Sequence, residues 1–149
     1  MAKIDIASAP QRSGTRYPAP FATPCQGRHV RRVGDAAGLT QFGVNLVEVP
    51  PGGWSSQRHW HTHEDEFVWM LEGELVMVTD EGEQVMRPGD CAGFKAGDRN
   101  GHHFQNRSSA KAVFLVVGSR NEADECGYPE IDLRALPDRG FTHRDGTPY

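Results

Sequence analysis

The 149-residue sequence predicts a single all-β domain of the sandwich or barrel type. Short apolar runs alternate with turn-forming residues from Gln41 to Gly118. Glycine (17) and proline (10) together make up about 18% of the chain, above the roughly 12% of average usage, which predicts many turns. No hydrophobic period of 3.6 residues lasts beyond two turns, so long helices are not expected.

Seven segments are expected to form strands because each is a short apolar run bounded by Gly, Pro, Asp or Ser. They are residues 43–49, 66–71, 74–79, 84–87, 91–94, 102–106 and 111–118. The aromatic side chains of these segments are expected in the core or lining the barrel: Phe67, Trp69, Phe94, Phe104 and Phe114. Cys91 lies in an apolar run and is expected to be buried as a small hydrophobic residue.

The composition divides the chain into three parts. Residues 1–40 are rich in Pro, Ala, Arg and Gly and are interpreted as an irregular N-terminal arm, which wraps the domain or reaches a partner subunit. Residues 41–118 form the barrel core. Residues 119–149 form a polar C-terminal tail that packs on the outside of the barrel, with at most one helical turn near residues 133–136.

Charge and composition exclude several classes of protein. The formal net charge is -4, and no long block of one sign indicates a nucleic-acid or membrane-surface partner. No apolar stretch is long enough to span a membrane, and the N-terminus lacks the apolar segment of a signal peptide. The three cysteines are scattered and odd in number, which is typical of reduced thiols, so a cytoplasmic location is expected.

Five of the seven histidines fall in two short clusters. In the first, His59 and His61 are two residues apart, so on a strand their side chains share a face. If residues 62–65 form a turn, Glu66 begins a neighbouring strand and faces back toward the two imidazoles. The second cluster contains His102 and His103, of which only one can join the same group, because neighbours on a strand face opposite sides. Three imidazoles and a carboxylate suit a divalent first-row metal ion.

The spacing of the first cluster resembles a motif of the cupin superfamily. Five residues separate Gly53 from His59, His61 follows after one residue, and four residues precede Glu66. Six residues then lead to Gly73, so every element of that motif is present.

The second cupin motif is matched with two departures. Gly89, Gly97, His102 and Asn106 occupy its positions, but Lys95 stands where the family usually has proline. Four residues instead of two separate Gly97 from His102, which lengthens a loop at the barrel mouth. The two motifs extend roughly over residues 43–118. The chain is also similar to small, stand-alone, single-domain bacterial cupins that are sometimes called sugar-phosphate-isomerase-like.

The resemblance implies a cupin double-stranded β-helix (jelly-roll) barrel with an internal metal site. Carried over by position, the ligands are His59, His61, Glu66 and His102. The cofactor implied is one divalent metal ion, with Zn, Mn, Fe and Ni all compatible with these donors.

These features lead to the hypothesis of a metal-dependent enzyme acting on a small oxygenated molecule such as a sugar or sugar phosphate, in an isomerase or lyase reaction. One alternative is an Fe-dependent dioxygenase, which uses the same ligands. Another is a non-catalytic module that binds a metabolite or sugar. A structural or storage barrel is the third, because a fold does not determine a function.

Four residues are candidates for catalysis, each weighed against an ordinary solvated side chain. Glu64 and Asp65 are candidate general bases, His63 is a candidate proton shuttle, and Lys95 is a cation that would meet an anionic substrate. His103 is expected to pack on the far side of its strand. The expected partner is a small-molecule ligand, with no nucleic acid and no membrane, and a homodimer through the arm or an unpaired strand edge is expected as well.

Overall fold

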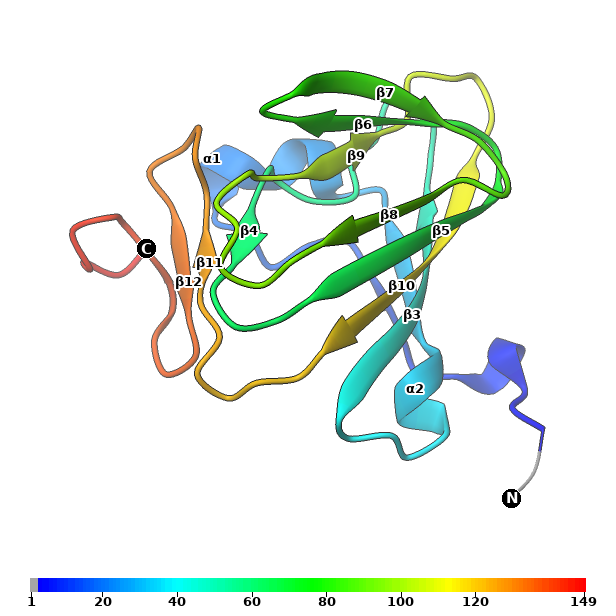
Figure 1. Cartoon of the computed structure of the whole chain (residues 1–149), viewed down its shortest axis with the longest axis horizontal. Helices are drawn as coiled ribbons and strands as arrows, with labels where there is room; N and C mark the ends of the chain where they lie inside the picture. Colours follow the sequence, from blue (N-terminus) through cyan, green and yellow to red (C-terminus); the bar gives the residue numbers. More distant parts are fainter. Residues whose placement is uncertain (1–2) are drawn as a thin grey trace.

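Strands dominate residues 3–149, the part of the chain that this computed structural model describes (Figure 1). The strands are β1 (Gln11–Ser13), β2 (His29–Arg32), β3 (Phe42–Val49), β4 (Trp60–His61), β5 (Glu66–Glu72), β6 (Leu75–Thr79), β7 (Gly82–Met86), β8 (Cys91–Phe94), β9 (His103–Gln105), β10 (Ala112–Ser119), β11 (Cys126–Gly127), β12 (Arg134–Leu136) and β13 (Gly140–Thr142). The helical turns are η1 (Ile6–Ser8), α1 (Ala19–Ala22), η2 (Thr23–Cys25) and α2 (Val33–Ala36). None of the helices in this part of the chain has the length and apolar character needed to cross a membrane.

The strands form three antiparallel sheets. A six-stranded sheet has the order β1-β2-β3-β10-β5-β8 and faces a three-stranded sheet of order β7-β6-β9 (Figure 1). A four-stranded sheet of order β13-β12-β11-β4 lies at one end of this pair. The all-β, jelly-roll prediction is therefore confirmed, and the seven expected segments correspond to β3 and β5 to β10 within a few residues.

The hydrophobic core lies between the six-stranded and the three-stranded sheet. Val68 and Met70 of β5 are fully buried there, as are Leu75 of β6 and, nearly so, Phe104 of β9. Only one face of each strand contributes side chains to this core, because successive side chains of a strand point to opposite sides.

The alternation of β5 turns its aromatic residues outward. Since Val68 and Met70 point inward, Phe67 and Trp69 are 43% and 46% exposed, and their expected place in the core is wrong. Cys91 pairs directly with Trp69 across β8 and β5 and is exposed too, contrary to expectation. Phe104 and Phe114 are core residues as predicted.

The motif glycine Gly73 is required by the backbone between β5 and β6. Its φ of 74° lies in the left-handed region, which glycine adopts without strain. A Cβ added there would lie 2.5 Å from the carbonyl oxygen of Lys111, so any larger residue would also collide with the chain entering β10.

The N-terminal arm wraps its own domain. β1 and β2 extend the six-stranded sheet beyond β3, with His29 opposite Glu48 in the register of β2 and β3. The arm was expected to be irregular, and it contains these strands because the edge of β3 offers free backbone groups that the arm satisfies.

The C-terminal tail packs on the end of the barrel as strands. At most one helical turn was expected near residues 133–136, and the structure has none there: residues 134–136 form β12, paired with β11 and β13. Ala135 lies opposite Phe141 in that pairing. The hydrogen bonds of this small sheet replace those that a helical turn would make.

Candidate metal centre

The backbone brings the two histidine clusters side by side. His59 and His102 form an antiparallel bridge, with N···O distances of 3.1 and 2.8 Å in the two directions. Their rings are 4.9 Å apart, measured between centroids. His61 lies two residues further on, on β4, and its ring centroid is 5.0 Å from that of His59. The shared strand face predicted for His59 and His61 explains this proximity.

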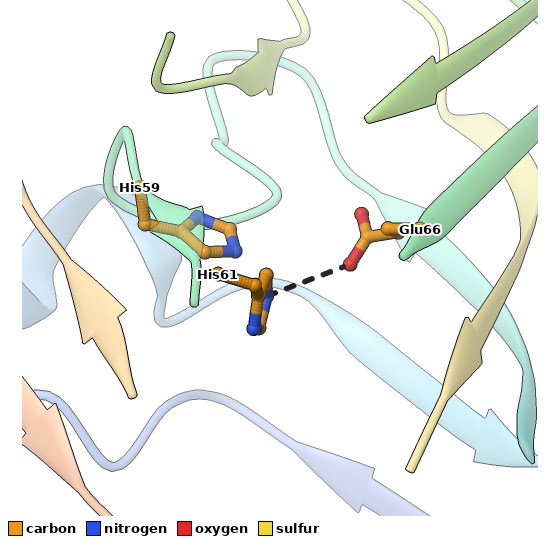
Figure 2. A group of neighbouring side chains, drawn as sticks. All are labelled: His59, His61 and Glu66. Carbon is orange, nitrogen blue, oxygen red and sulfur yellow. Dashed lines mark ion pairs between the residues drawn. The ribbon is translucent and has the colours of Figure 1, made fainter. Parts of the chain in front are cut away.

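Glu66 completes a compact group of donor atoms. Residues 62–65 form the link between β4 and β5, so Glu66 opens β5 and faces the two imidazoles, as Figure 2 shows. One donor atom from each of His59, His61 and Glu66 lies within 4.8 Å of the others. The shortest ion pair within this group joins His61 Nε2 and Glu66 Oε2 at 3.9 Å.

His102 adjoins this group through Glu66. Its Nε2 lies 3.2 Å from Glu66 Oε1, and its ring stacks on Phe94 with the centroids 3.5 Å apart. Only 2% of the His102 side chain is exposed. The structure thus brings all four predicted ligands together, three as a mutually close group and the fourth against the glutamate.

The hydrogen bonds behind the imidazoles fit a metal ion. His59 Nδ1 lies 2.9 Å from the carbonyl oxygen of Gln57, and His61 Nδ1 lies 2.6 Å from Asp124 Oδ2. Both Nδ1–H groups therefore donate to oxygen acceptors, which leaves Nε2 of each ring as the atom for a cation. Because the pKa of His61 is raised to about 10, its Nε2 gives up a proton when the cation binds. Two such imidazoles and a carboxylate are a donor set for a divalent first-row metal ion.

The electrostatics keep His59 and Glu66 in the forms that bind a cation. Burial, helped by the field of His102, lowers the pKa of His59 to about 3, so this imidazole is neutral at pH 7. Burial alone would raise the pKa of Glu66, but the hydrogen bond and field of His102 outweigh it, so the pKa is below its usual range. At neutral pH Glu66 is therefore an ionised carboxylate and His59 is a neutral imidazole.

His61 belongs to a second group of donor atoms, which the sequence analysis missed. The ligand atoms of His61, Asp124 and Cys126 also lie within 4.8 Å of one another. Burial lowers the pKa of His61, but the interactions with Cys126, Asp124 and Glu66 outweigh it and raise the pKa to about 10. Asp124 and Cys126 come from the tail, where no local pattern marks them as partners of a histidine 63 and 65 residues away.

A cavity of about 310 Å³ adjoins the donor group. It is lined by His59, Glu66 and His102, and also by side chains from the arm and the tail. The polar residues contributed by those two segments are Arg12, Thr15, Arg16, Tyr17, Arg28, Cys126 and Tyr128. The arm and the tail therefore build much of the wall around the candidate metal centre, which composition alone did not indicate.

A second cavity, of about 250 Å³, is lined by His61 and His102. Of the four candidate catalytic residues, Glu64 and Lys95 line it. The lengthened loop before His102 contributes Asn100 to the same wall.

His63 and Asp65 line neither of these two cavities. The exposed His63 ring contacts Thr62 Oγ1 at 2.8 Å, and Asp65 Oδ1 accepts the backbone N–H of Ala96 at 2.8 Å. His103 is buried, with Nδ1 3.1 Å from the carbonyl oxygen of Ser56, and packs away from the donor group as expected.

Comparisons with known proteins identify the fold family. The model of the family described as "Cupin domain" matches residues 45–118. A cupin-superfamily sugar phosphate isomerase from Silicibacter pomeroyi is 48% identical, with a TM-score of 0.92, and the match covers 99% of this chain and 96% of that one. None of the curated proteins compared with this chain matches it.

Two more solved structures are similar over most of the chain. A protein from Acidithiobacillus ferrooxidans, provisionally named a sugar phosphate isomerase, is 27% identical with a TM-score of 0.74 and matches 83% of this chain and 80% of its own. The polyketide cyclase RemF from Streptomyces resistomycificus is 23% identical with a TM-score of 0.65, matches 80% of this chain and 79% of its own, and shows the fold alone. Together with the strand order and the two histidine clusters, these matches show that the chain belongs to the cupin superfamily.

Proposed function

We propose that this cupin is a metal-dependent enzyme that acts on a small oxygenated molecule such as a sugar or sugar phosphate, in an isomerase or lyase reaction. One observation carries the proposal. His59 and Glu66, two members of the group of donor atoms that suits a divalent ion, line a cavity of about 310 Å³, and Tyr17 and Tyr128 line the same cavity. That volume is at the lower end of the range for small-molecule sites.

The proposed ligands are His59, His61, Glu66 and His102, holding one divalent ion of Zn, Mn, Fe or Ni. When bound, such an ion supplies Lewis-acid chemistry, because it polarises hydroxyl and carbonyl oxygens of a ligand. The carboxylate of Asp124 and the carbonyl of Gln57 would hold the imidazoles in the required orientation.

Two tyrosines are suited to orient a substrate oxygen in the cavity. Burial raises the pKa of Tyr17 to about 12 and also raises the pKa of Tyr128, so both hydroxyls keep their protons at neutral pH. The Tyr17 hydroxyl accepts hydrogen bonds from Tyr128 Oη at 3.5 Å and from the backbone N–H of Gln57 at 3.3 Å. Within residues 3–149 its own proton has no acceptor, so it is available to a ligand.

The proton transfer that isomerisation or elimination needs is assigned to the candidates that face a cavity. Glu64 and Lys95 line the second cavity, beside His61, whereas His63 and Asp65 line neither cavity. Because the tyrosines line the first cavity, the assignment requires the substrate to reach both cavities at His102, which lines each of them. The carboxylate of Glu64 also accepts the backbone N–H of Asn121 at 2.7 Å, which holds it in place. The name of the 48%-identical relative supports an isomerase reaction over oxygen chemistry.

The test is elemental analysis of protein purified without added metal or chelator. We expect near-stoichiometric metal in the parent protein and its loss in the double variant H59A/H61A. The matched control is H29A/H63A, which removes two exposed histidines outside the donor group and should keep the metal. Protein that contains no metal and takes none up would overturn the enzyme proposal in favour of a metabolite-binding module. Stoichiometric iron with oxygen consumption would replace the isomerase reaction by a dioxygenase reaction.

We also propose that the protein is a cytoplasmic homodimer. The free thiols of Cys25, Cys91 and Cys126 support a reducing compartment. The outward row of Phe67, Trp69 and Leu71 on β5 is an apolar surface that a second copy would cover. Light scattering after size exclusion should give twice the chain mass of 16.5 kDa, and a monomeric mass at micromolar concentration contradicts the dimer.

A further inference from the structure

We infer that the cavity beside the candidate metal centre holds a phosphate group of its ligand against three arginines of the N-terminal arm, Arg12, Arg16 and Arg28. The inference depends on the proposed function in one respect: the molecule that carries the phosphate also reaches the donor group. All three arginines line the cavity together with His59 and Glu66. They lie outside residues 45–118, the segment that the family model matches.

Among residues 3–149, two of the three guanidinium groups have no protein partner. The side chains of Arg12 and Arg16 form neither an ion pair nor a hydrogen bond with any residue in the range 3–149. Elsewhere on the molecule, arginines pair with carboxylates, namely Arg32, Arg58, Arg87, Arg107, Arg120 and Arg134. The cavity therefore presents cationic donors that the fold itself does not use.

The arginines are also close enough to repel one another. Partial burial and the fields of Arg28 and Arg16 lower the pKa of Arg12. Glu66 is the one carboxylate among the residues that line this cavity, and it belongs to the metal-binding group. A bound anion would relieve the repulsion and supply the missing acceptors.

Arg28 fixes the part of the arm that carries this charge. Its Nε donates to the carbonyl oxygen of Gly14 at 3.2 Å, and its Nη1 donates to the carbonyl oxygen of Ser55. Gly14 has a φ of 77°, a left-handed turn directly after β1, and its N–H donates to the carbonyl oxygen of Arg28 at 2.8 Å. This turn leads residues 15–17 into the cavity wall, so the cationic site is held in place by the fold.

The number of donors favours phosphate over carboxylate. One guanidinium saturates both oxygens of a carboxylate in a bidentate pair, whereas a phosphate monoester offers three terminal oxygens and up to two negative charges. Three guanidinium groups around one cavity match the larger charge and the larger number of acceptors.

The test measures binding of inorganic phosphate to chelator-treated protein by isothermal titration calorimetry, with acetate as the second probe. Using the metal-free form means that phosphate cannot bind through an ion. We expect saturable phosphate binding that is at least about tenfold weaker in R12Q/R16Q, because each substitution removes charge-assisted hydrogen bonds. The variant R16K, which keeps the charge but loses the planar fork, should be intermediate.

The matched control is R87Q/R139Q. It removes the same charge at two exposed positions that line neither the cavity of about 310 Å³ nor the second cavity of about 250 Å³. It should bind phosphate within about twofold of the parent protein, since only long-range electrostatics change. Equal loss in both double variants, acetate binding as tight as phosphate, or no saturable binding would each overturn the inference. Because metal content is measured separately, phosphate binding by protein that takes up no metal would refute the proposed function and leave this site standing.

Discussion

Asp124 Oδ2 lies 2.6 Å from Nδ1 of His61, although the two residues are 63 positions apart. The other carboxylate oxygen of Asp124 accepts the backbone N–H of His63 at 2.8 Å, so one side chain holds both the imidazole and the turn that follows it. Asp124 lies outside residues 45–118. A segment beyond the matched cupin domain therefore orients a proposed ligand of the metal centre.

The substitution D124N should weaken metal binding by about 10- to 100-fold. Asparagine keeps an acceptor for the backbone of His63, but its amide would present a donor to His61 Nδ1. The imidazole would then carry its proton on Nε2, the atom that faces Glu66. Affinity is measured by competition with a chromogenic chelator, and the tautomer by nitrogen NMR of the histidine ring. E122Q, which removes a nearby exposed carboxylate, should bind metal like the parent protein; unchanged affinity in D124N argues against the positioning role.

Phe104 is expected to be among the costliest core residues to truncate. It is 2% exposed and packs against Phe114 with the ring centroids 5.4 Å apart. F104A should lower the free energy of unfolding by about 3–5 kcal/mol, because the lost burial adds to the cost of a cavity. F67A removes the same atoms from a position that is 43% exposed in the single chain, so at a concentration where the protein is monomeric it should cost less than about 1 kcal/mol. Urea titration compares the two, and similar losses would mean that β5 does not present Phe67 to solvent.

Asn106, the last residue of the second motif, should matter for stability and not for metal content. Its amide nitrogen donates to the carbonyl oxygens of Val49 and Ala110, each at 2.8 Å, and its side chain is almost fully buried. N106A would leave two acceptors without their donor, which costs on the order of 1–3 kcal/mol for each one that stays buried. Thermal or urea unfolding measures the loss, and elemental analysis of the folded variant should show parent-level metal. Loss of metal from a variant that remains folded would contradict a purely structural role.

The three thiols should differ in reactivity toward Ellman's reagent at pH 8. Burial raises the pKa of Cys25 to about 11, so below that pH the folded protein keeps it as the unreactive thiol. Cys91 is exposed and should react in the native state. The number of thiols that react in native protein should fall by one in C91A and stay unchanged in C25A. A decrease in C25A would show that Cys25 is accessible.

The positions of the strands could be predicted from sequence, but the face of β5 that is buried could not. Both faces of β5 are apolar, with Phe67, Trp69 and Leu71 on one side and Val68 and Met70 on the other. Alternation indicates the buried face only when the other face is polar. The prediction of a buried Phe67 and Trp69 failed for this reason.

The sequences of the strands in the arm and the tail do not by themselves predict strands. β1 reads Gln-Arg-Ser and β2 reads His-Val-Arg-Arg, and neither has the apolar alternation of a strand. β2 is a strand because β3 offers it an edge to pair with, and β1 pairs in turn with β2. The tail strand β12 is likewise stabilised by its neighbours β11 and β13, and not by local propensity.

The all-β class, the core strands and the convergence of His59, His61 and Glu66 could all be predicted from the amino-acid sequence. These features depend on the two-residue period of a strand and on one short turn, which are local properties. That Asp124 contacts His61, and that three arginines of the arm line the cavity beside the donor group, depends on the tertiary structure. Such contacts join segments far apart along the chain, and they arise from how sheets pack and edges pair, which no local pattern encodes.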